Sequence, residues 1–316
     1  MPRFDVTIAG ELNMDLILYG LPAELPPERE LLADRMMLTL GGSSAIVAHN
    51  LAALGSRVGY QSRIGDDQMG KLSLERLSEI GVDVSHVRQI PGPIKSGLSI
   101  ILQRDGWRNI LTYSGTIAEL TWTDLDLDYL ADSRHFHLCS FYLQTALQPH
   151  VAGIFKSLKK KGLTTSLDTN DDPEDRWDGG LRDVLPHLDV FFPNAREARR
   201  IAGTDDLEVA IKFLADIVPV VVIKLGHEGA MAQRGKERFF SPAFRVEAID
   251  AVGAGDSFDA GFLHEFIQGA DFTTCLSAGN RAGALSATRA GGTEAFRDSA
   301  HRIEFLRKHE LALAQK

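Results

Sequence analysis

The stretch Arg245-Val246-Glu247-Ala248-Ile249-Asp250-Ala251-Val252-Gly253-Ala254-Gly255-Asp256 carries the strongest local signal for the fold. Its first four residues are typical of a short strand. After Asp256, apolar side chains share one helical face, and Gly269 is a residue type that commonly ends a helix. That face consists of Phe258, Phe262, Leu263, Phe266 and Ile267. The two glycines of the stretch are therefore predicted to lie in a strand-to-helix turn.

Strand and helix signals alternate along the rest of the chain. Short apolar runs, which are typical of strands buried on both faces, occur at residues 4–9, 58–62, 136–139, 164–167, 190–192 and 220–223. Helical segments are predicted at about 44–54 and 69–79. This alternation predicts an α/β fold with a three-layer, doubly wound, mostly parallel sheet, built as a single domain over residues 1–316.

Two segments interrupt the alternation, at about residues 12–38 and 93–116. The second contains Asp105-Gly106 between two strand-like runs, which is a strong hairpin signal. We expect the two segments to form one small antiparallel β-sheet that projects from the main domain. A flap over the ends of a parallel sheet is suited to act as a lid on a site that must exclude water.

Composition limits the partners and the compartment. The 316 residues carry a formal net charge of -9, which argues against a nucleic-acid or anionic-membrane partner. The two cysteines, Cys139 and Cys275, are far apart in the sequence and form no metal-binding motif, so no structural zinc site is expected. Unpaired thiols, no signal-peptide pattern at the N-terminus and no long apolar run predict a cytoplasmic protein.

The glycine turn has the residue types that phosphoryl transfer requires. Backbone N–H groups at Gly253, Ala254 and Gly255 can approach an anion closely, and the start of a helix adds free donors and a positive dipole end. Asp256, in the first helical turn, can accept the proton of an attacking hydroxyl. The alternative is a tight turn in which Asp256 only complements the helix dipole, and the local pattern leaves both interpretations open.

Three further motifs have a functional and a structural interpretation. Asn194 and Glu197, after the strand at 190–192, can act on magnesium-bound water and phosphate, but their spacing alone favours a helix capping box. The glycines of Lys224-Leu225-Gly226-His227-Glu228-Gly229 suit nucleotide binding, or an ordinary β-turn. Gly41-Gly42-Ser43-Ser44 can admit a ligand to backbone donors, or simply provide a serine N-cap.

Several motifs of other enzyme classes do not occur. No GxxxxGK[ST] is present, and no GxGxxG follows a strand, which argues against a P-loop enzyme and a dinucleotide-binding Rossmann enzyme. HExxH and GxSxG do not occur either.

Taken together, these residues resemble the ribokinase-like (PfkB) family of carbohydrate kinases, over nearly the whole chain. The stretch from Asp250 to Asp256 is similar to the C-terminal signature of that family. Residues 41–55, Gly-Gly-Ser-Ser-Ala-Ile-Val-Ala-His-Asn-Leu-Ala-Ala-Leu-Gly, are similar to its N-terminal signature. The order and spacing of the motifs also agree. The resemblance implies a ribokinase-like kinase domain that transfers the γ-phosphate of ATP to a hydroxyl of a small sugar or sugar derivative, with Mg²⁺.

The resemblance also implies roles for individual residues. The catalytic set is Asp256 as base with Gly253, Ala254 and Gly255 as anion hole. The substrate contacts are Asn13, Asp15, Gly42 and Ser43. The ATP and magnesium site comprises Asn194, Glu197, Lys224, Gly226, Gly229 and Asn280. A monovalent cation, with K⁺ as the candidate ion, would be held by oxygens of Asp250, Val252, Ser286, Arg289 and Gly291. Lids of this family often pair between two subunits, which implies a homodimer.

Two positions depart from the family pattern. Ile46 stands where the N-terminal signature usually has an asparagine that touches the substrate, so the acceptor is not expected to be plain ribose. Ala251 replaces the usual threonine of the C-terminal signature. A nucleoside kinase of the same fold, in which Ile46 faces a base, is one alternative. A catalytically silent sugar- or nucleotide-binding regulator is the other, and the intact Asp256 argues against it.

Overall fold

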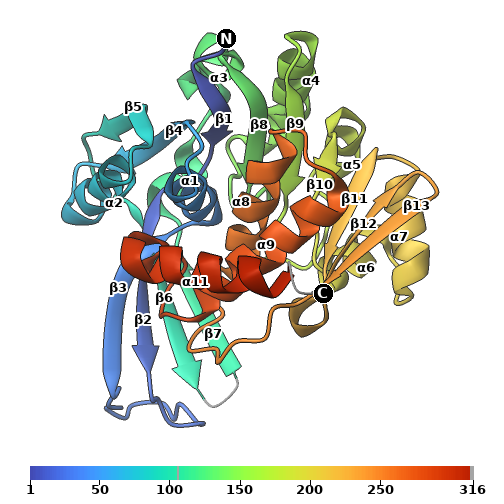
Figure 1. The fold of residues 1–316 in the computed structure, drawn as a ribbon. Coiled ribbons are helices and arrows are strands. Elements are labelled where there is room, and N and C mark those ends of the chain that lie inside the picture. The colour runs from blue at the N-terminus through green and yellow to red at the C-terminus, as the bar shows by residue number, and fades with distance from the viewer. Residues whose placement is uncertain (105–106, 314–316) are drawn as a thin grey trace.

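The computed structural model describes residues 1–104 and 107–313, and within them two sheets are formed (Figure 1). In the main sheet the strand order is β13-β12-β11-β10-β9-β8-β1-β4-β5, and in the small sheet it is β3-β2-β6-β7. From β11 to β5 each strand runs parallel to its neighbour, whereas β12 and β13 are antiparallel. The predicted α/β fold with a mostly parallel sheet is confirmed.

The strands of the main sheet are β1 (Phe4–Ala9), β4 (Val58–Gly65), β5 (Asp83–Ile90), β8 (Ser133–Cys139), β9 (Thr164–Asp168), β10 (Val190–Phe191), β11 (Val220–Lys224), β12 (Gly229–Arg234) and β13 (Glu237–Pro242). Alternate side chains of a strand point to opposite faces, and β11 illustrates the consequence. Val221 and Ile223 lie in one hydrophobic core, and Val220 and Val222 lie in another. The apolar runs of the sequence are therefore strands buried on both faces, as predicted.

Helices cover both faces of this sheet. One face packs against α3 (Leu127–Ala131), α4 (Val151–Lys160), α5 (Leu181–Val184), α6 (Ala195–Ala202) and α7 (Leu207–Ala215). The other face packs against α1 (Ser43–Ala53), α2 (Gln68–Glu79), α8 (Ala254–Phe266) and α9 (Phe272–Ala287). The chain ends with α10 (Glu294–Arg297) and α11 (Ser299–Leu313), and α11 lies across the front of the molecule in Figure 1. None of these helices within residues 1–104 and 107–313 has the length and apolarity to cross a bilayer.

The small sheet projects from the main body at the lower left of Figure 1. Its strands are β2 (Asn13–Tyr19), β3 (Arg35–Gly41), β6 (Gly97–Arg104) and β7 (Trp107–Tyr113). β2 pairs with β3, and β6 with β7, in antiparallel fashion, but β2 and β6 run parallel, so the sheet is mixed. It arises from the two segments that interrupt the sequence pattern. The predicted hairpin turn at Asp105-Gly106 lies outside the described residues.

The predicted strand at 245–248 was wrong. These residues form neither strand nor helix. Instead, Phe244 and Val246 pack against a helical core that includes Leu285 and Phe296, so the alternating side chains serve helix packing rather than strand pairing. The predicted start of the following helix is confirmed, because α8 begins at Ala254 with Gly253 as its N-cap.

Candidate active site

The carboxyl ends of five neighbouring strands meet at one edge of the main sheet. Polar residues stand at or just after these ends: Glu11 after β1, Ser140 after β8, Asp168 in β9, Asn194 after β10 and Lys224 in β11. β1 lies between β8 and β4, so the strand order reverses there. Ligands of open α/β sheets bind outside the carboxyl ends of the strands at such a switch point. The Ser140 hydroxyl donates to Glu11 Oε1 across it at 2.7 Å.

The start of α8 faces this edge. Gly253 adopts φ 72°, and a Cβ there would lie 2.5 Å from Gly292 Cα, so both its conformation and its contact require glycine. Gly255 is exposed, and a Cβ on it would lie an ordinary 3.7 Å from Lys224 Nζ. The N–H groups of Gly255 and Asp256 belong to the first helical turn, which offers them no intrahelical acceptor. The turn thus presents free donors beside a carboxylate.

Asp256 is buried, with 7% of its surface exposed. Asn170, just beyond β9, donates through Nδ2 to Asp256 Oδ1 at 3.4 Å and to Ser43 Oγ at 2.9 Å. The amide oxygen of Asn170 accepts from the Ser140 backbone N–H at 2.9 Å. Asn170 has a positive φ of 54°, an uncommon conformation that places its side chain in this network. One amide therefore connects the carboxylate with the end of β8 and the start of α1.

A buried ion-pair cluster lies next to Asp256. Lys224 Nζ is 2.5 Å from Asp168 Oδ2 and 3.3 Å from Asp259 Oδ2, and both carboxylates are almost completely buried. Burial opposes the charge on Lys224, but the two carboxylates outweigh it and raise the pKa of the ammonium above its usual value. Burial also raises the pKa of Asp168, but Lys224 and hydrogen bonds outweigh it and leave that pKa below normal. Burial raises the pKa of Asp259 well above its usual value.

The surroundings keep the Asp256 carboxylate poised for proton transfer. Burial, reinforced by the negative charge of Asp168, raises its pKa to about 6, and Lys224 and Ser43 limit the rise. At neutral pH the carboxylate is therefore mostly ionised, yet basic enough to take a proton from a hydroxyl. Burial and the charge of Asp256 raise the pKa of Asp15 to about 7.

The predicted substrate contacts lie together at the base of the small sheet. Asn13 and Asp15 are buried neighbours on β2, and Asn13 Nδ2 is 3.3 Å from Asp15 Oδ1. A Cβ on Gly42 would lie 2.6 Å from Asn13 Oδ1, so the loop before α1 closely approaches this asparagine. Ser43 reaches Asp256 through Asn170. The structure thus brings all four predicted contacts near the predicted base.

Asn194 and Glu197 form the capping box that their spacing favours. The Asn194 side chain accepts from the N–H groups of Arg196 and Glu197, and Glu197 Oε2 accepts from Asn194 N–H at 2.9 Å. Glu197 is nevertheless buried beside the ion-pair cluster, where burial and Asp168 raise its pKa to about 7. The cap thus also places a carboxyl group near the strand ends.

The other predicted nucleotide residues flank the end of β11. Gly229 has φ 117°, and a Cβ on it would lie 2.2 Å from the carbonyl oxygen of Ser241. Asn280 on α9 donates to that same carbonyl at 2.8 Å, so Gly229 and Asn280 lie close together. Gly226 is exposed in the turn between β11 and β12.

The predicted cation residues come from two segments that lie side by side. The Ile249 N–H donates to the Ala287 carbonyl at 2.8 Å. Asp250 accepts hydrogen bonds from Tyr19 OH at 2.7 Å, from Val252 N–H at 3.0 Å and from Gly291 N–H at 3.2 Å. Two further predicted residues, Ser286 and Arg289, lie on the segment of Ala287 and Gly291, and the Arg289 guanidinium turns away to Asp298 at 2.6 Å. No three His, Cys, Asp or Glu side chains in residues 1–104 and 107–313 form a ready metal site.

Several residues of the site were missed from sequence alone. Asp168 and Ser140 directly follow apolar runs, Glu11 and Asn170 stand two and three residues beyond such runs, and Asp259 stands one helical turn after Asp256, so position could have indicated all five.

Ile46 is buried against the glycine turn at the start of α8. Its Cδ1 lies 3.3 Å from a Cβ built on Gly253 and 2.7 Å from one built on Gly292. The apolar side chain therefore supports the glycine turn.

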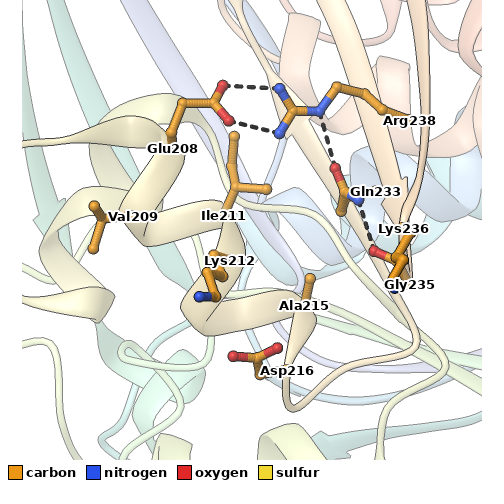
Figure 2. A pocket seen from close by; sticks show the side chains of 10 residues that line it. All are labelled: Glu208, Val209, Ile211, Lys212, Ala215, Asp216, Gln233, Gly235, Lys236 and Arg238. Atoms are coloured by element: carbon orange, nitrogen blue, oxygen red, sulfur yellow. Dashed lines mark hydrogen bonds and ion pairs between the residues drawn. The ribbon is translucent and has the colours of Figure 1, made fainter.

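A surface cavity of about 630 Å³ lies at the opposite end of β11 and β12 (Figure 2). Its lining consists of Glu208, Val209, Ile211, Lys212, Ala215, Asp216, Gln233, Gly235, Lys236 and Arg238. Arg238 makes two hydrogen bonds to Glu208, at 2.9 and 2.7 Å, and a third to Gln233. Because Val220 pairs with Arg234 and Lys224 with Ala230, this cavity adjoins the amino end of β11 and is separate from the ion-pair cluster of Lys224.

A buried carboxylate beside helix N–H donors at the strand ends suits a phosphotransferase with an alcohol group as acceptor, and similarity to known proteins shows that class. Residues 3–298 match the pfkB family carbohydrate kinase model, so the chain belongs to that family. It is 30% identical to the 2-dehydro-3-deoxygluconokinase of Bacillus subtilis, covering 80% of this chain and 82% of the relative. It is 31% identical to the ATP-dependent ribose-1-phosphate kinase of Halopiger xanaduensis, covering 92% and 94%.

Solved structures show the same fold. An E. coli protein assigned as a ribokinase II, determined in complex with ATP and Mg²⁺, has a TM-score of 0.83 and 25% identity. The similarity covers 97% of this chain and 100% of that one. The predicted family and fold are thus confirmed, and the protein is a sugar or nucleoside kinase of the PfkB family.

Proposed function

We propose that this protein transfers the γ-phosphate of ATP to a hydroxyl of a small sugar or sugar derivative, with Asp256 as the catalytic base. The observation that carries the proposal is the position of Asp256. Its carboxylate is buried in the first turn of α8, contacts Asn170, and lies beside the N–H donors of the Gly253–Gly255 turn.

The acceptor would bind at the base of the small sheet. Asp15 would accept hydrogen bonds from the hydroxyls of the acceptor, and Asn13 would donate hydrogen bonds to them. Gly42 and Ser43, at the start of α1, would form the facing wall of the site. The attacking hydroxyl would lose its proton to Asp256 as its oxygen bonds to the γ-phosphorus and ADP leaves. Asn170 would hold the carboxylate in the orientation for this transfer.

The phosphoryl group would be stabilised by the glycine turn. The exposed backbone at Gly255 and the helix start provide donors aimed at developing negative charge, at no cost of reorganisation. Gly253 and Ala254 complete the turn. Lys224, Gly226, Gly229 and Asn280 would line the nucleotide site at the end of β11.

The residues present also fit Mg²⁺. Magnesium in kinases is held by one or two carboxylates together with substrate phosphates, and it neutralises the charge that develops in phosphoryl transfer. A buried acid such as Glu197, whose pKa is raised by burial and then by the charge of Asp168, is suited to this, with Asn194 positioning Glu197 through the cap.

A monovalent cation such as K⁺ would be held beside the anion hole. The Asp250 carboxylate and the backbone carbonyls of Val252, Ser286, Arg289 and Gly291 would supply its oxygens. The contact between residues 249–252 and 286–291 supports this proposal.

A homodimer through the small sheet is the proposed assembly. β7 is an edge strand whose residues are all exposed, and Trp107, Ile110, Leu111 and Tyr113 are large apolar side chains on it. Exposed apolar edges of this kind mark interaction sites. Both cysteines are buried and unpaired, which supports a reducing, cytoplasmic location.

The alternative is a nucleoside kinase of the same fold, which an Ile46 facing a base would suit. Ile46 packs against Gly253 and Gly292, so its position gives this alternative no added support. Nucleosides are therefore included among the acceptors of the assay below.

The experiment is an ADP-release assay with ATP and Mg²⁺ against ribose, deoxyribose, fructose and nucleosides, using the wild type and Asp256→Asn. We expect turnover with at least one acceptor, and a loss of about a thousandfold or more in Asp256→Asn, with its melting temperature and ATP affinity retained. Wild-type turnover in the variant would remove Asp256 from the role of base.

A further inference from the structure

Asn50 on α1 is a completely buried amide that contacts the first turn of α8. Its Nδ2 donates to Ser257 Oγ at 2.9 Å and to the Gly292 carbonyl at 3.0 Å. Its Oδ1 lies 2.8 Å from His49 Nδ1. A carbonyl can only accept, so the contact with Gly292 fixes which end of the amide carries the two donors. Both donors and the oxygen of Asn50 are therefore engaged, as buried polar groups generally are.

Both acceptors of Asn50 lie against Gly253, the N-cap of α8. The single proton of the Ser257 hydroxyl goes to its nearest acceptor, the Gly253 carbonyl at 2.7 Å, so hydrogen bonds run from Asn50 through Ser257 to that carbonyl. Gly292 also contacts Gly253, because a Cβ on Gly253 would lie 2.5 Å from Gly292 Cα. One amide thus fixes two neighbours of the residue whose left-handed backbone, at φ 72°, leads the chain into α8.

Ile46 supports the same turn from one helical turn earlier on α1. Residues four apart lie on one face of a helix, so Ile46 and Asn50 share a face. Ile46 Cδ1 lies 3.3 Å and 2.7 Å from Cβ atoms built on Gly253 and Gly292. Apolar contacts are non-directional, whereas hydrogen bonds prefer a narrow range of angles. Of these two side chains, only Asn50 can therefore set the orientation of a polar group in the turn.

The Gly253 carbonyl shares a planar peptide group with the Ala254 N–H. A hydrogen bond that fixes the direction of this carbonyl therefore also fixes the direction of that N–H. The Ala254 N–H makes only a long hydrogen bond, 3.3 Å to the Ala251 carbonyl, which holds it weakly. The Gly255 N–H belongs to the next peptide group of the same helix start. The contacts of Asn50 thus reach the donors of the proposed anion hole.

We infer, building on the proposed function, that Asn50 is a positioning residue for phosphoryl transfer. It holds the Gly253 peptide group through Ser257 and Gly292, so that the N–H groups of the turn are oriented before the reaction begins. Donors oriented in advance stabilise developing charge without a cost of reorganisation. Because Asn50 is completely buried behind these contacts, its loss should slow the chemical step and leave the binding of ATP and acceptor nearly unchanged.

The test compares Asn50→Ala, Ser257→Ala and the double variant with the wild type by ADP release, with an acceptor on which the wild type turns over. We expect kcat to fall about tenfold or more in Asn50→Ala and about threefold in Ser257→Ala, with each KM within about twofold of the wild type. Because both residues act on one carbonyl, the double variant should be within about twofold of Asn50→Ala.

An unchanged kcat in folded Asn50→Ala, a change in KM alone, or fully additive effects of the two substitutions would overturn the inference. Ser257→Ala is a small substitution in a helix and keeps the test decisive if Asn50→Ala is too unstable to purify. In that case an unchanged kcat in Ser257→Ala overturns the inference.

Thr165→Val is the matched control for a loss of stability. Thr165 is completely buried near the amino end of β9, and its hydroxyl donates to the His187 carbonyl at 2.8 Å. Valine has nearly the same shape, so this variant also removes a buried hydrogen bond to a carbonyl, but far from the strand ends that carry the site. We expect a lower melting temperature and an unchanged kcat. A fall in kcat equal to that of Asn50→Ala would show that the loss follows stability rather than position.

A mixture of ADP, Mg²⁺ and aluminium fluoride, which mimics a phosphoryl group during transfer, separates this inference from the proposed function. Its binding to the full-length protein is measured by calorimetry, without turnover. If no acceptor is turned over, the proposed function is contradicted, but weaker binding of the mixture by Asn50→Ala with unchanged binding of ADP alone still supports the inference. Turnover with equal kcat in both proteins does the reverse. A wild type that neither turns over nor binds the mixture contradicts both.

Discussion

An ion pair lies near each end of β11, a buried one at its carboxyl end and an exposed one near its amino end. At the carboxyl end, Lys224 pairs with Asp168, whose side chain is 1% exposed. At the amino end, Arg238 pairs with Glu208, whose side chain is 65% exposed (Figure 2). Water screens the second pair but not the first. The buried ion pair therefore takes part in shifting the pKa values of its neighbours, whereas the exposed ion pair only lines one side of the cavity.

This difference indicates where the loss of a charge should affect the free energy of unfolding. Buried charges that lose a partner are costly, because nothing else solvates the charge that remains. Exposed ion pairs contribute about 0–1 kcal/mol. The following variants break or sharpen this contrast.

The largest effect is expected for Lys224→Met. It leaves Asp168 and Asp259 buried without their cation, and we expect a loss of about 3–5 kcal/mol in the free energy of unfolding. The pKa of Asp256 should rise further, because Lys224 lowers it. Urea denaturation measures the loss in the free energy of unfolding, and the pH dependence of ADP release measures the pKa of Asp256. A variant as stable as the wild type would show that the cluster is not held by this lysine.

Glycine substitutions at the turn before α8, the proposed anion hole, should separate effects on folding from effects on activity. Gly253→Ala places a Cβ at φ 72° and 2.5 Å from Gly292, so we expect a loss of about 2 kcal/mol or more in stability. Gly255→Ala meets only an ordinary contact, 3.7 Å from Lys224 Nζ, and should fold with near-normal stability. Its methyl group should nevertheless lower kcat at least about tenfold by crowding the phosphoryl site. Equal effects of the two variants on melting temperature would contradict this assignment.

Asp15→Asn should stabilise the protein at high pH. The folded pKa of Asp15 is raised to about 7, above its unfolded value of about 3.9, so its stabilising contribution is complete at low pH and is lost as pH rises through 7. Asparagine has no such charge to bury. We expect a gain of about 1–2 kcal/mol over the wild type at pH 8 that shrinks toward pH 5. Thermal melts across this range measure it, and a gain that is constant with pH would contradict the account.

The smallest effect is expected for Arg238→Met at the remote cavity. Its partner Glu208 is exposed and remains solvated, so stability should change by less than about 1 kcal/mol and kcat/KM should be unchanged. The same urea and ADP-release measurements apply. A loss as large as that in Lys224→Met would remove the contrast between the two ends.

The main sheet could be predicted because its strands are short apolar runs with few other interpretations. Val220 to Ile223 divides its side chains between two cores, and the sequence shows this as an unbroken apolar run. The segment 245–248 shows the limit of that reasoning, because Val246 is partly buried against helices and does not pair in a strand. Whether an alternating segment pairs or packs depends on neighbours that are distant in the sequence.

Residues of the site were predictable where a motif places them on one element. Asp256 and the glycines belong to a single turn, and Asn194 and Glu197 to a single cap. Asn170, Ser140 and Glu11 meet only because three strands end at the same edge, and their spacing in the sequence carries no trace of this. The side chain of Ile46 likewise turns to Gly292, a contact across 246 positions that no local pattern encodes.

The pH dependence of kcat/KM, compared between the wild type and Asp256→Asn, tests the central claim most directly. The base must be ionised, and the pKa of Asp256 is about 6 in the folded protein. The account predicts that wild-type kcat/KM falls about tenfold per unit below pH 6 and that the residual activity of Asp256→Asn lacks this fall. A wild-type profile that stays flat from pH 5 to 8, or the same acid limb in the variant, would contradict it.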